Sequence, residues 1–301
     1  MKPPTEWHNK GEAVEEWIDL HFFRPLGMRI ARALRDTGVS ADQVTVVGLV
    51  LGLLAGHLFF YRNPWINFAG FLLFVFVELL DSVDGQLARI RGVSTRWGRL
   101  LDGIADTARF TNVYVQFTLR LLLNHGGPET WALISLALAS HSMQSGAIDF
   151  IRNAYLEAGE GRDGDLDLPE SLGRMRGRTL GQRLAAWVYR PYVQRQVWLF
   201  PRSVALARAL RKTGGAGGLE AEACRAEYRE RQRPLVVQCG WLGQNMRLIL
   251  LGLLPLIGGP YGYLWITIIP LNLITLTLIG LHERNAVLLL APAAARQRVE
   301  A

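Results

Sequence analysis

The chain contains little cysteine and little charge for its length. Two of its 301 residues are cysteines, Cys224 and Cys239, and only 20% are charged, whereas 50% are hydrophobic. The cysteines have no CxxC spacing and no nearby pair of histidines, so the sequence argues against a zinc site and favours two reduced thiols. The low content of charge argues against a water-soluble core of this size and favours a membrane protein.

The N-terminal segment, MKPPTEWHNKGEAVEEW, lacks the features of a secretory signal. It has no apolar h-region and no small-residue cleavage site, so we expect no removable signal peptide and expect the first spanning helix to direct insertion. The net charge of +7 would suit nucleic acid, but the arginines gather in particular loops between apolar runs. We therefore expect anionic membrane lipids and phosphorylated substrates as partners, and no nucleic acid.

Six apolar stretches come close to the roughly 20 residues that a helix needs to cross a bilayer. They cover residues 44–61, 65–80, 99–123, 129–151, 246–257 and 261–281. We expect the second to continue as a helix through residues 81–90, and the fifth reaches full length only by including residues such as Trp241. The pattern predicts an all-α integral membrane protein with six transmembrane helices.

The distribution of arginine predicts the orientation of these helices. Arginines precede the first stretch and fill the connections between the second and third and between the fourth and fifth, whereas the opposite loops contain only Arg62. Because cytoplasmic loops carry an excess of basic residues, both termini are expected in the cytoplasm. In a bacterium the protein would lie in the inner membrane.

These patterns divide the chain into four segments. Residues 1–40 form a cytoplasmic and interfacial segment whose amphipathic helix or helix pair, interrupted at Pro25, lies on the membrane or packs against the insert. Residues 41–154 contain the first four spans, residues 155–240 a long basic cytoplasmic insert, and residues 241–301 the last two spans and a tail. The aromatic-rich run within the insert, residues 187–200, indicates a further interfacial helix pair.

Four aspartates lie at the ends of the second and third stretches. Asp81 and Asp84 are spaced i, i+3, and Asp102 and Asp106 are spaced i, i+4, so each pair shares one helix face. An ionised carboxylate in a span costs at least ~2.5 kcal/mol, and four that converge repel one another unless cations lie between them. Oxygen ligands of this kind favour two Mg²⁺ or Mn²⁺ ions, which suit a pyrophosphate substrate.

The residues around the aspartates fit a nucleotide. Gly85 permits close approach of a nucleotide or another helix, with Ala88 beside it, and Arg89 can clamp a phosphate. Gly98 has no side chain and permits the same close approach at the start of the next helix. Thr95 supplies a hydroxyl in the loop that connects the two helices.

Residues 81–106 read DSVDGQLARIRGVSTRWGRLLDGIAD. They fit the pattern DxxDGxxAR, followed by a spacer of eight residues and then GxxxDxxxD. This resembles the signature of the CDP-alcohol phosphotransferase family at every fixed position. Upstream, SADQVTVVG resembles the PNxVT-like entry of that family to the first span, with Ala41 and Asp42 in place of proline and asparagine. The likeness covers about residues 25–155, and the long insert is not typical of the family.

The resemblance implies roles for single residues. Asp81 and Asp102 would bridge two metal ions, Asp84 would bind one of them, and Asp106 the other. Asp106 would also be the general base that deprotonates the acceptor hydroxyl for attack on the β-phosphorus, with CMP departing. The implied donor site consists of Gly85, Ala88, Arg89, Thr95, Gly98, Asp42 and Thr45. A homodimer is implied as well.

The acceptor site is less defined. Arg152 loosely resembles a phosphate-binding arginine of some members, and it equally suits a basic anchor at the end of a span. Asp149 shares one helix face with His141 and Ser145, and this face either lines the acceptor pocket or forms hydrogen bonds between helices. Arg109, which follows Asp106, either pairs with an aspartate or contacts the acceptor.

Two enzymatic and two other functions fit these residues. The first is transfer of a phosphatidyl group from CDP-diacylglycerol to a polar alcohol, which in some members is phosphorylated. The second uses a CDP-amino-alcohol and diacylglycerol. A divalent-metal transporter would distribute its acids through the bilayer, and a scaffold with a vestigial site would not need the intact signature. The clustered aspartates favour the enzyme.

Overall fold

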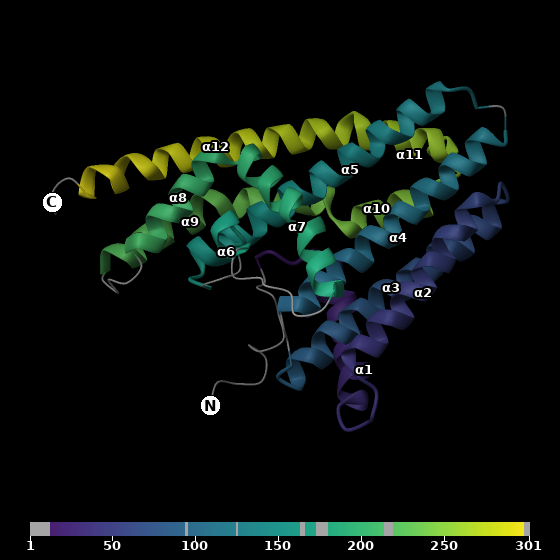
Figure 1. Cartoon of the computed structure of the whole chain (residues 1–301), viewed down its shortest axis with the longest axis horizontal. Helices are drawn as coiled ribbons and strands as arrows, with labels where there is room; N and C mark the ends of the chain where they lie inside the picture. Colours follow the sequence, from purple (N-terminus) through teal and green to yellow (C-terminus); the bar gives the residue numbers. More distant parts are fainter. Residues whose placement is uncertain are drawn as a thin grey trace. The chain divides into compact units, whose positions relative to one another are not determined.

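The computed structural model describes residues 13–93, 96–124, 126–162, 166–172, 180–213 and 219–297. In these ranges the chain is helical and forms no strand (Figure 1), which confirms the all-α prediction. The chain divides into two compact units. The first consists of Met1–His141 and Gln244–Pro270, and the second of Ser142–Gly243 and Leu271–Ala301.

The first unit is built on α2 (Ala41–His57) and α3 (Pro64–Ile90), which pack side by side (Figure 1). A capping box begins α2, because the Gln43 amide donates to Ser40 Oγ and the Ser40 amide donates to Gln43 Oε1, at 3.1 and 2.8 Å. Asn63 caps α3 and Pro64 occupies its first turn. As predicted, α3 continues without a break through residues 81–90.

Two further long helices are α4 (Arg96–Leu122) and α5 (Glu129–Ala154), and α2 packs against α4 as well as α3. The approach of α2 to α4 depends on glycine. A Cβ atom at Gly52 would collide with the side chain of Arg109, and one at Gly56 would collide with Asn112. Glycine therefore allows α4 to bring polar side chains against α2.

The described part of the N-terminal segment contains helix that packs against α3. A π-helical turn (Asp19–Phe23) passes into α1 (Arg24–Leu34), with Pro25 in the first turn of α1. Phe23 is buried, whereas Trp17 is 71% exposed. The exposed side chain of Trp17 fits the predicted position at the membrane interface, and α1 also packs against α3.

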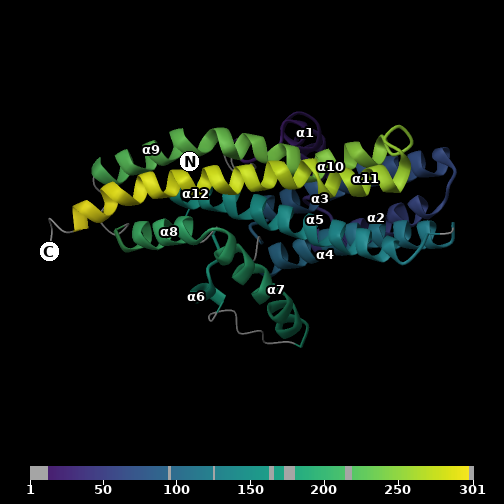
Figure 2. The ribbon, with the colours of Figure 1, turned by 90° about the horizontal axis from the view of Figure 1, so that it is seen from above.

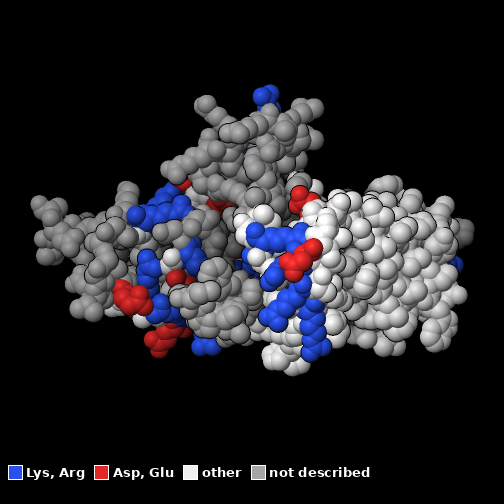
Figure 3. Space-filling model, turned by 90° about the horizontal axis from the view of Figure 1, so that it is seen from below, with Lys and Arg blue, Asp and Glu red and all other residues white. Residues whose placement is uncertain are grey.

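In the space-filling view, a group of Lys and Arg side chains borders a broad uncharged face (Figure 3).

The helices near the C-terminus differ from the predicted spans. α10 (Gln244–Gly252) ends earlier than the stretch 246–257 suggested, and α11 (Gly259–Ile268) is followed by α12 (Pro270–Gln297). Pro255 and Pro270 account for these boundaries, because proline removes a backbone donor and restricts the residue before it. Among the described residues, three stretches are long and apolar enough to cross a membrane: Ala41–Phe60, Pro64–Ile90 and Gly259–Leu290. They support an integral membrane protein, and the count of six spans stays a prediction.

The insert contains α6 (Pro169–Leu172), α7 (Leu180–Leu199), α8 (Pro201–Thr213) and α9 (Leu219–Gln238). α9 runs alongside α12 (Figure 2), and Asn285 on α12 donates to the Arg231 carbonyl at 3.1 Å. Gln196 on α7 donates to the Gly146 carbonyl on α5 at 2.9 Å. The structure forms no disulfide at Cys224 or Cys239.

Candidate functional site

Arg109 brings together two of the four predicted aspartates. Its Nη2 atom lies 3.1 Å from Asp81 Oδ1 on α3, and it also forms an ion pair with Asp106, one turn earlier on α4. The Arg109 side chain is 3% exposed, and those of Asp81 and Asp106 are each 32% exposed. One buried guanidinium group therefore compensates two carboxylates that come from different helices and face a more open space.

Asp84 is more buried, at 8% exposure. The Thr45 hydroxyl donates to Asp84 Oδ2 at 2.6 Å, and the same hydroxyl lies 3.2 Å from the Ala41 carbonyl within α2. The predicted donor residue Thr45 is thus joined directly to the predicted metal ligand Asp84. Helices α2, α3 and α4 all contribute to the site.

The other predicted donor residues occupy the end of α3 and the start of α2. Gly85, Ala88 and Arg89 are partly buried, and a Cβ atom at Gly85 would lie 3.5 Å from Arg89 Nη1. Asp42 is exposed in the first turn of α2. Thr95, the surroundings of Gly98 and the side chain of Asp102 lie outside the described residues. The described residues of the predicted donor site are compatible with a nucleotide that approaches the backbone at Gly85.

The donor set suits a hard divalent cation, because Asp81, Asp84 and Asp106 offer carboxylate oxygens. In the part of the chain that the structure describes, no three His, Cys, Asp or Glu residues lie close enough together to hold a metal ion. Arg109 lies against Asp81 and Asp106 instead. Arg109 therefore supplies positive charge to these two carboxylates, and the contribution of Asp102 to a metal site stays a prediction.

Comparison with known proteins identifies the region that contains this site. Residues 39–161 match the CDP-alcohol phosphatidyltransferase family. The chain contains a CDP-alcohol phosphatidyltransferase domain. This domain includes α2 to α5, and therefore every described aspartate of the predicted cluster.

Curated relatives also match part of the chain. An archaetidylinositol phosphate synthase of Pyrococcus horikoshii is 32% identical over 117 residues, which are 39% of this chain and 57% of that protein. A phosphatidylinositol phosphate synthase of Streptomyces avermitilis is 35% identical over 109 residues, 36% of this chain and 44% of the relative. A CDP-diacylglycerol–glycerol-3-phosphate 3-phosphatidyltransferase of Cereibacter sphaeroides is 30% identical over 87 residues, 29% of this chain and 37% of the relative. The matches therefore span about half or less of each relative.

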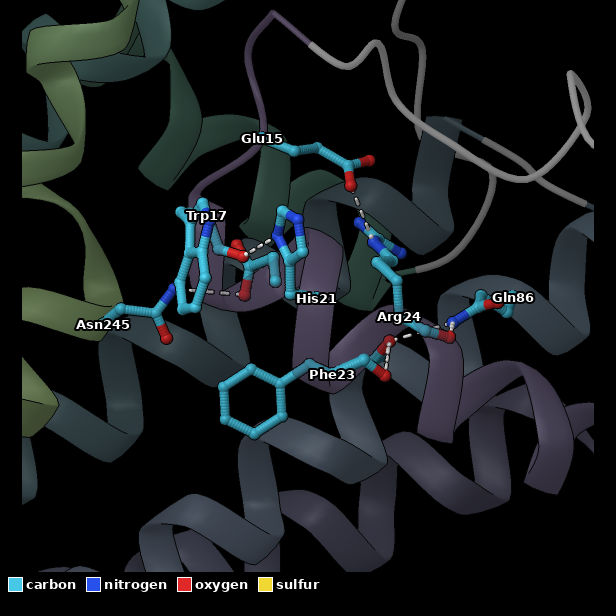
Figure 4. Close-up of polar contacts among 9 residues, drawn as sticks. Glu15, Trp17, His21, Phe23, Arg24, Gln86 and Asn245 are labelled. Atoms are coloured by element: carbon cyan, nitrogen blue, oxygen red, sulfur yellow. Dashed lines mark hydrogen bonds and ion pairs between the residues drawn. The ribbon is translucent and has the colours of Figure 1, made fainter.

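Two side chains of α3, Ser82 and Gln86, join the CDP-alcohol phosphatidyltransferase domain to the N-terminal segment through hydrogen bonds. Ser82 Oγ donates to the Phe23 carbonyl at 3.1 Å, and Gln86 Nε2 donates to the Arg24 carbonyl at 3.0 Å (Figure 4). The sequence analysis missed these contacts. The available signal was that Ser82 and Gln86, four residues apart, form a polar pair on one face of α3.

Glu78 is a second residue of the domain that the sequence analysis missed. It lies one turn before Asp81 on the same helix face, and its Oε1 accepts a hydrogen bond from Gln244 Nε2 at 2.5 Å. The bond attaches α3 to the start of α10, within the first unit. A carboxylate inside the apolar stretch 65–80 was the signal, because such a group requires a partner.

The predicted acceptor residues have partners of their own. Arg109 pairs with Asp81 and Asp106, which favours the first of the two roles considered for it. Asp149 and Arg152 belong to the second unit, where the Tyr192 hydroxyl donates to Asp149 Oδ2. His141 Nδ1 lies 3.1 Å from the Tyr114 hydroxyl. For His141 and Asp149, these contacts favour hydrogen bonding between helices, and an acceptor role stays a prediction.

Proposed function

We propose that this protein transfers a phosphatidyl group from CDP-diacylglycerol to the hydroxyl of a polar alcohol and releases CMP. The observation that carries the proposal is the meeting of Asp81 and Asp106 at Arg109, within an intact family signature. One relative is named for CDP-diacylglycerol and glycerol 3-phosphate, and others are named for phosphatidylinositol phosphate. These names favour CDP-diacylglycerol over a CDP-amino-alcohol as donor, and a phosphorylated alcohol as acceptor.

In the proposed reaction, the acceptor oxygen forms a bond to the β-phosphorus of the donor while the bond to the CMP oxygen breaks. Asp106 accepts the proton of the acceptor hydroxyl, and its partial exposure leaves it open to that hydroxyl. Arg89 and the backbone at Gly85 contact the phosphates of the donor. Thr45 orients Asp84 through its 2.6 Å hydrogen bond.

Asp81, Asp84, Asp102 and Asp106 would hold one or two Mg²⁺ or Mn²⁺ ions. When bound, such ions neutralise pyrophosphate oxygens and stabilise the departing phosphate. Arg109 is a positioning residue in this proposal, because it holds Asp81 and Asp106 at a common point.

The membrane arrangement is proposed with the function. Six spans would place the aspartates at the cytoplasmic surface, with both termini in the cytoplasm and the insert on the same side. The three apolar stretches support insertion in the membrane. A homodimer is proposed from the family resemblance alone.

The experiment that tests donor and acceptor follows CMP release by the purified full chain in the presence of Mg²⁺. CDP-diacylglycerol is offered with glycerol 3-phosphate, inositol phosphate, glycerol or inositol, and CDP-ethanolamine is offered with diacylglycerol. We expect release from CDP-diacylglycerol with at least one phosphorylated acceptor. Release only from CDP-ethanolamine would replace the proposed donor, and no release with any pair would contradict the enzymatic function.

A further inference from the structure

A hollow with two arginines lies at the opposite end of α3 and α4 from the aspartates. It has a volume of about 450 Å³, and its lining includes Arg62, Asn67, Arg120, Asn124, Gly259 and Tyr261. All of these residues belong to the first unit. At 1.5 Å per residue, Asn67 lies about 21 Å along α3 from Asp81, and Arg120 lies about 21 Å along α4 from Asp106. The hollow is therefore separate from the predicted catalytic site.

The two arginines are held in place without being neutralised. Arg62 Nη1 donates to Asn124 Oδ1 at 2.7 Å. Arg120 Nη1 donates to Asn67 Oδ1 at 3.0 Å and lies 3.3 Å from the Phe59 carbonyl. These acceptors are neutral amides, and none of the described residues that line the hollow is acidic. Two guanidinium groups thus share one hollow without a carboxylate, an arrangement that an anion would stabilise.

The backbone at the hollow adds to its positive character. α11 begins here, and no side chain caps its first turn. Gly258 and Gly259, which precede and begin this helix, have φ values of 87° and 69°, so glycine permits the tight turn that brings the helix start to the hollow. The start of a helix carries partial positive charge and favours anions.

The position of these arginines is unusual for a membrane protein. The loops at this end contain a single arginine, Arg62, whereas the loops at the other end contain many. In the proposed orientation this end faces away from the cytoplasm, where loops are depleted of basic residues, so an arginine there calls for a specific reason. Arg120, from the last turn of α4, meets Arg62 in the same hollow.

We propose that this hollow binds a phosphate group, carried by an anionic lipid headgroup or by a free phosphate compound. Arg62 and Arg120 contact the phosphate oxygens, because guanidinium groups present paired N–H donors that match them. Asn67 and Asn124 keep the two guanidinium groups directed toward the ligand. The site goes beyond the proposed transferase activity and does not depend on it.

The test compares lipid retention by the purified full chain, measured by native mass spectrometry after exposure to phosphatidylglycerol or phosphatidylcholine. The wild type should retain phosphatidylglycerol in preference, and the double variant Arg62→Gln, Arg120→Gln should lower that preference about tenfold or more. A matched control, Arg29→Gln with Arg32→Gln, removes the same charge from exposed positions of α1 and should retain the preference.

Two further measurements identify the source of the phosphate and test whether a loss of binding reflects misfolding. Displacement of phosphatidylglycerol by millimolar inorganic phosphate would assign the site to a free phosphate compound, and resistance to displacement would assign it to a lipid headgroup. Arg62 is exposed, so Arg62→Gln alone should weaken retention without loss of fold. No preference in the wild type, or an equal loss in the α1 control, would overturn the proposal.

Discussion

The hydroxyl of Thr45 on α2 donates a 2.6 Å hydrogen bond to the carboxylate of Asp84 on α3. The bond joins the first apolar helix to the signature, although 39 residues separate the two in sequence. We expect Thr45→Val to lower kcat/KM for CMP release about tenfold, because the buried carboxylate loses a donor worth about 1–3 kcal/mol. Thr45→Ser keeps the hydroxyl and should keep most of the activity. Equal activity in the serine and valine variants would show that the hydroxyl has no role.

Removal of Arg109 should affect stability and metal dependence together. Without its guanidinium group, Asp81 and Asp106 repel each other, so Arg109→Gln should unfold at a lower temperature than the wild type in EDTA. Mg²⁺ should restore more of the unfolding temperature in this variant than in the wild type, because the cation replaces the lost charge. Thermal unfolding with and without Mg²⁺ measures both effects. An unfolding temperature that is unchanged in EDTA would contradict the proposed role of Arg109.

The contact between α2 and α4 should tolerate no side chain at Gly52. A methyl group there would collide with the buried side chain of Arg109, so Gly52→Ala should destabilise the protein by about 1–3 kcal/mol and reduce CMP release. Gly38→Ala is the matched control, because a Cβ atom at Gly38 meets nothing within 4 Å. Denaturant unfolding and the transfer assay provide the readouts. A Gly52→Ala protein as stable and active as the control would contradict the close packing.

Glu283 should hold the start of α8 against α12. Its carboxylate accepts hydrogen bonds from the backbone amides of Arg202 and Ser203, both at 2.9 Å, and from the Ser203 hydroxyl at 2.6 Å. Glu283→Ala should therefore raise hydrogen exchange in residues 201–204 and destabilise the second unit by about 1 kcal/mol. The exposed Glu230→Ala variant serves as control. Unchanged hydrogen exchange in residues 201–204 would rule out that Glu283 stabilises the start of α8.

The predicted interfacial position of α7 can be tested through its tryptophans. Trp187 and Trp198 are 71% and 77% exposed, whereas Val193 and Phe200 are fully buried. Eleven residues bring a helix back to nearly the same face, so both indoles point away from the buried side. A spin label at Trp187→Cys, in a chain without its native cysteines, should be more accessible to oxygen than to a water-soluble nickel complex. A label at Glu230→Cys should show the reverse, and nickel access at position 187 would place α7 in water.

Long helices with a strong local pattern could be predicted from the sequence. The continuation of α3 through residues 81–90 follows from the absence of proline and from the spacing of Asp81 and Asp84, which are local properties. The end of α10 at Gly252 was not predicted, because apolar composition alone does not reveal where turns interrupt a short stretch. Pro255, three residues beyond, was the overlooked signal.

Contacts between distant segments were predicted only in part. The aspartates were found because their spacing is a local pattern. The pairing of Arg109 with Asp106 follows from their i, i+3 spacing on α4. Its pairing with Asp81 depends on how α3 and α4 are rotated against each other, which no local pattern determines. The bond from Ser82 to the Phe23 carbonyl likewise depends on the path of the N-terminal segment.

The central claim is that the aspartates at the ends of α3 and α4 carry out phosphatidyl transfer. The most direct measurement is CMP release from CDP-diacylglycerol by the wild type, Asp106→Asn and Asp36→Asn, each with Mg²⁺ and with EDTA. Asp36 is an exposed carboxylate beside Arg35, outside the site, and its variant is the matched control. We predict Mg²⁺-dependent release by the wild type and by Asp36→Asn, and a loss of about 100-fold or more in Asp106→Asn. Full activity in Asp106→Asn would contradict the account.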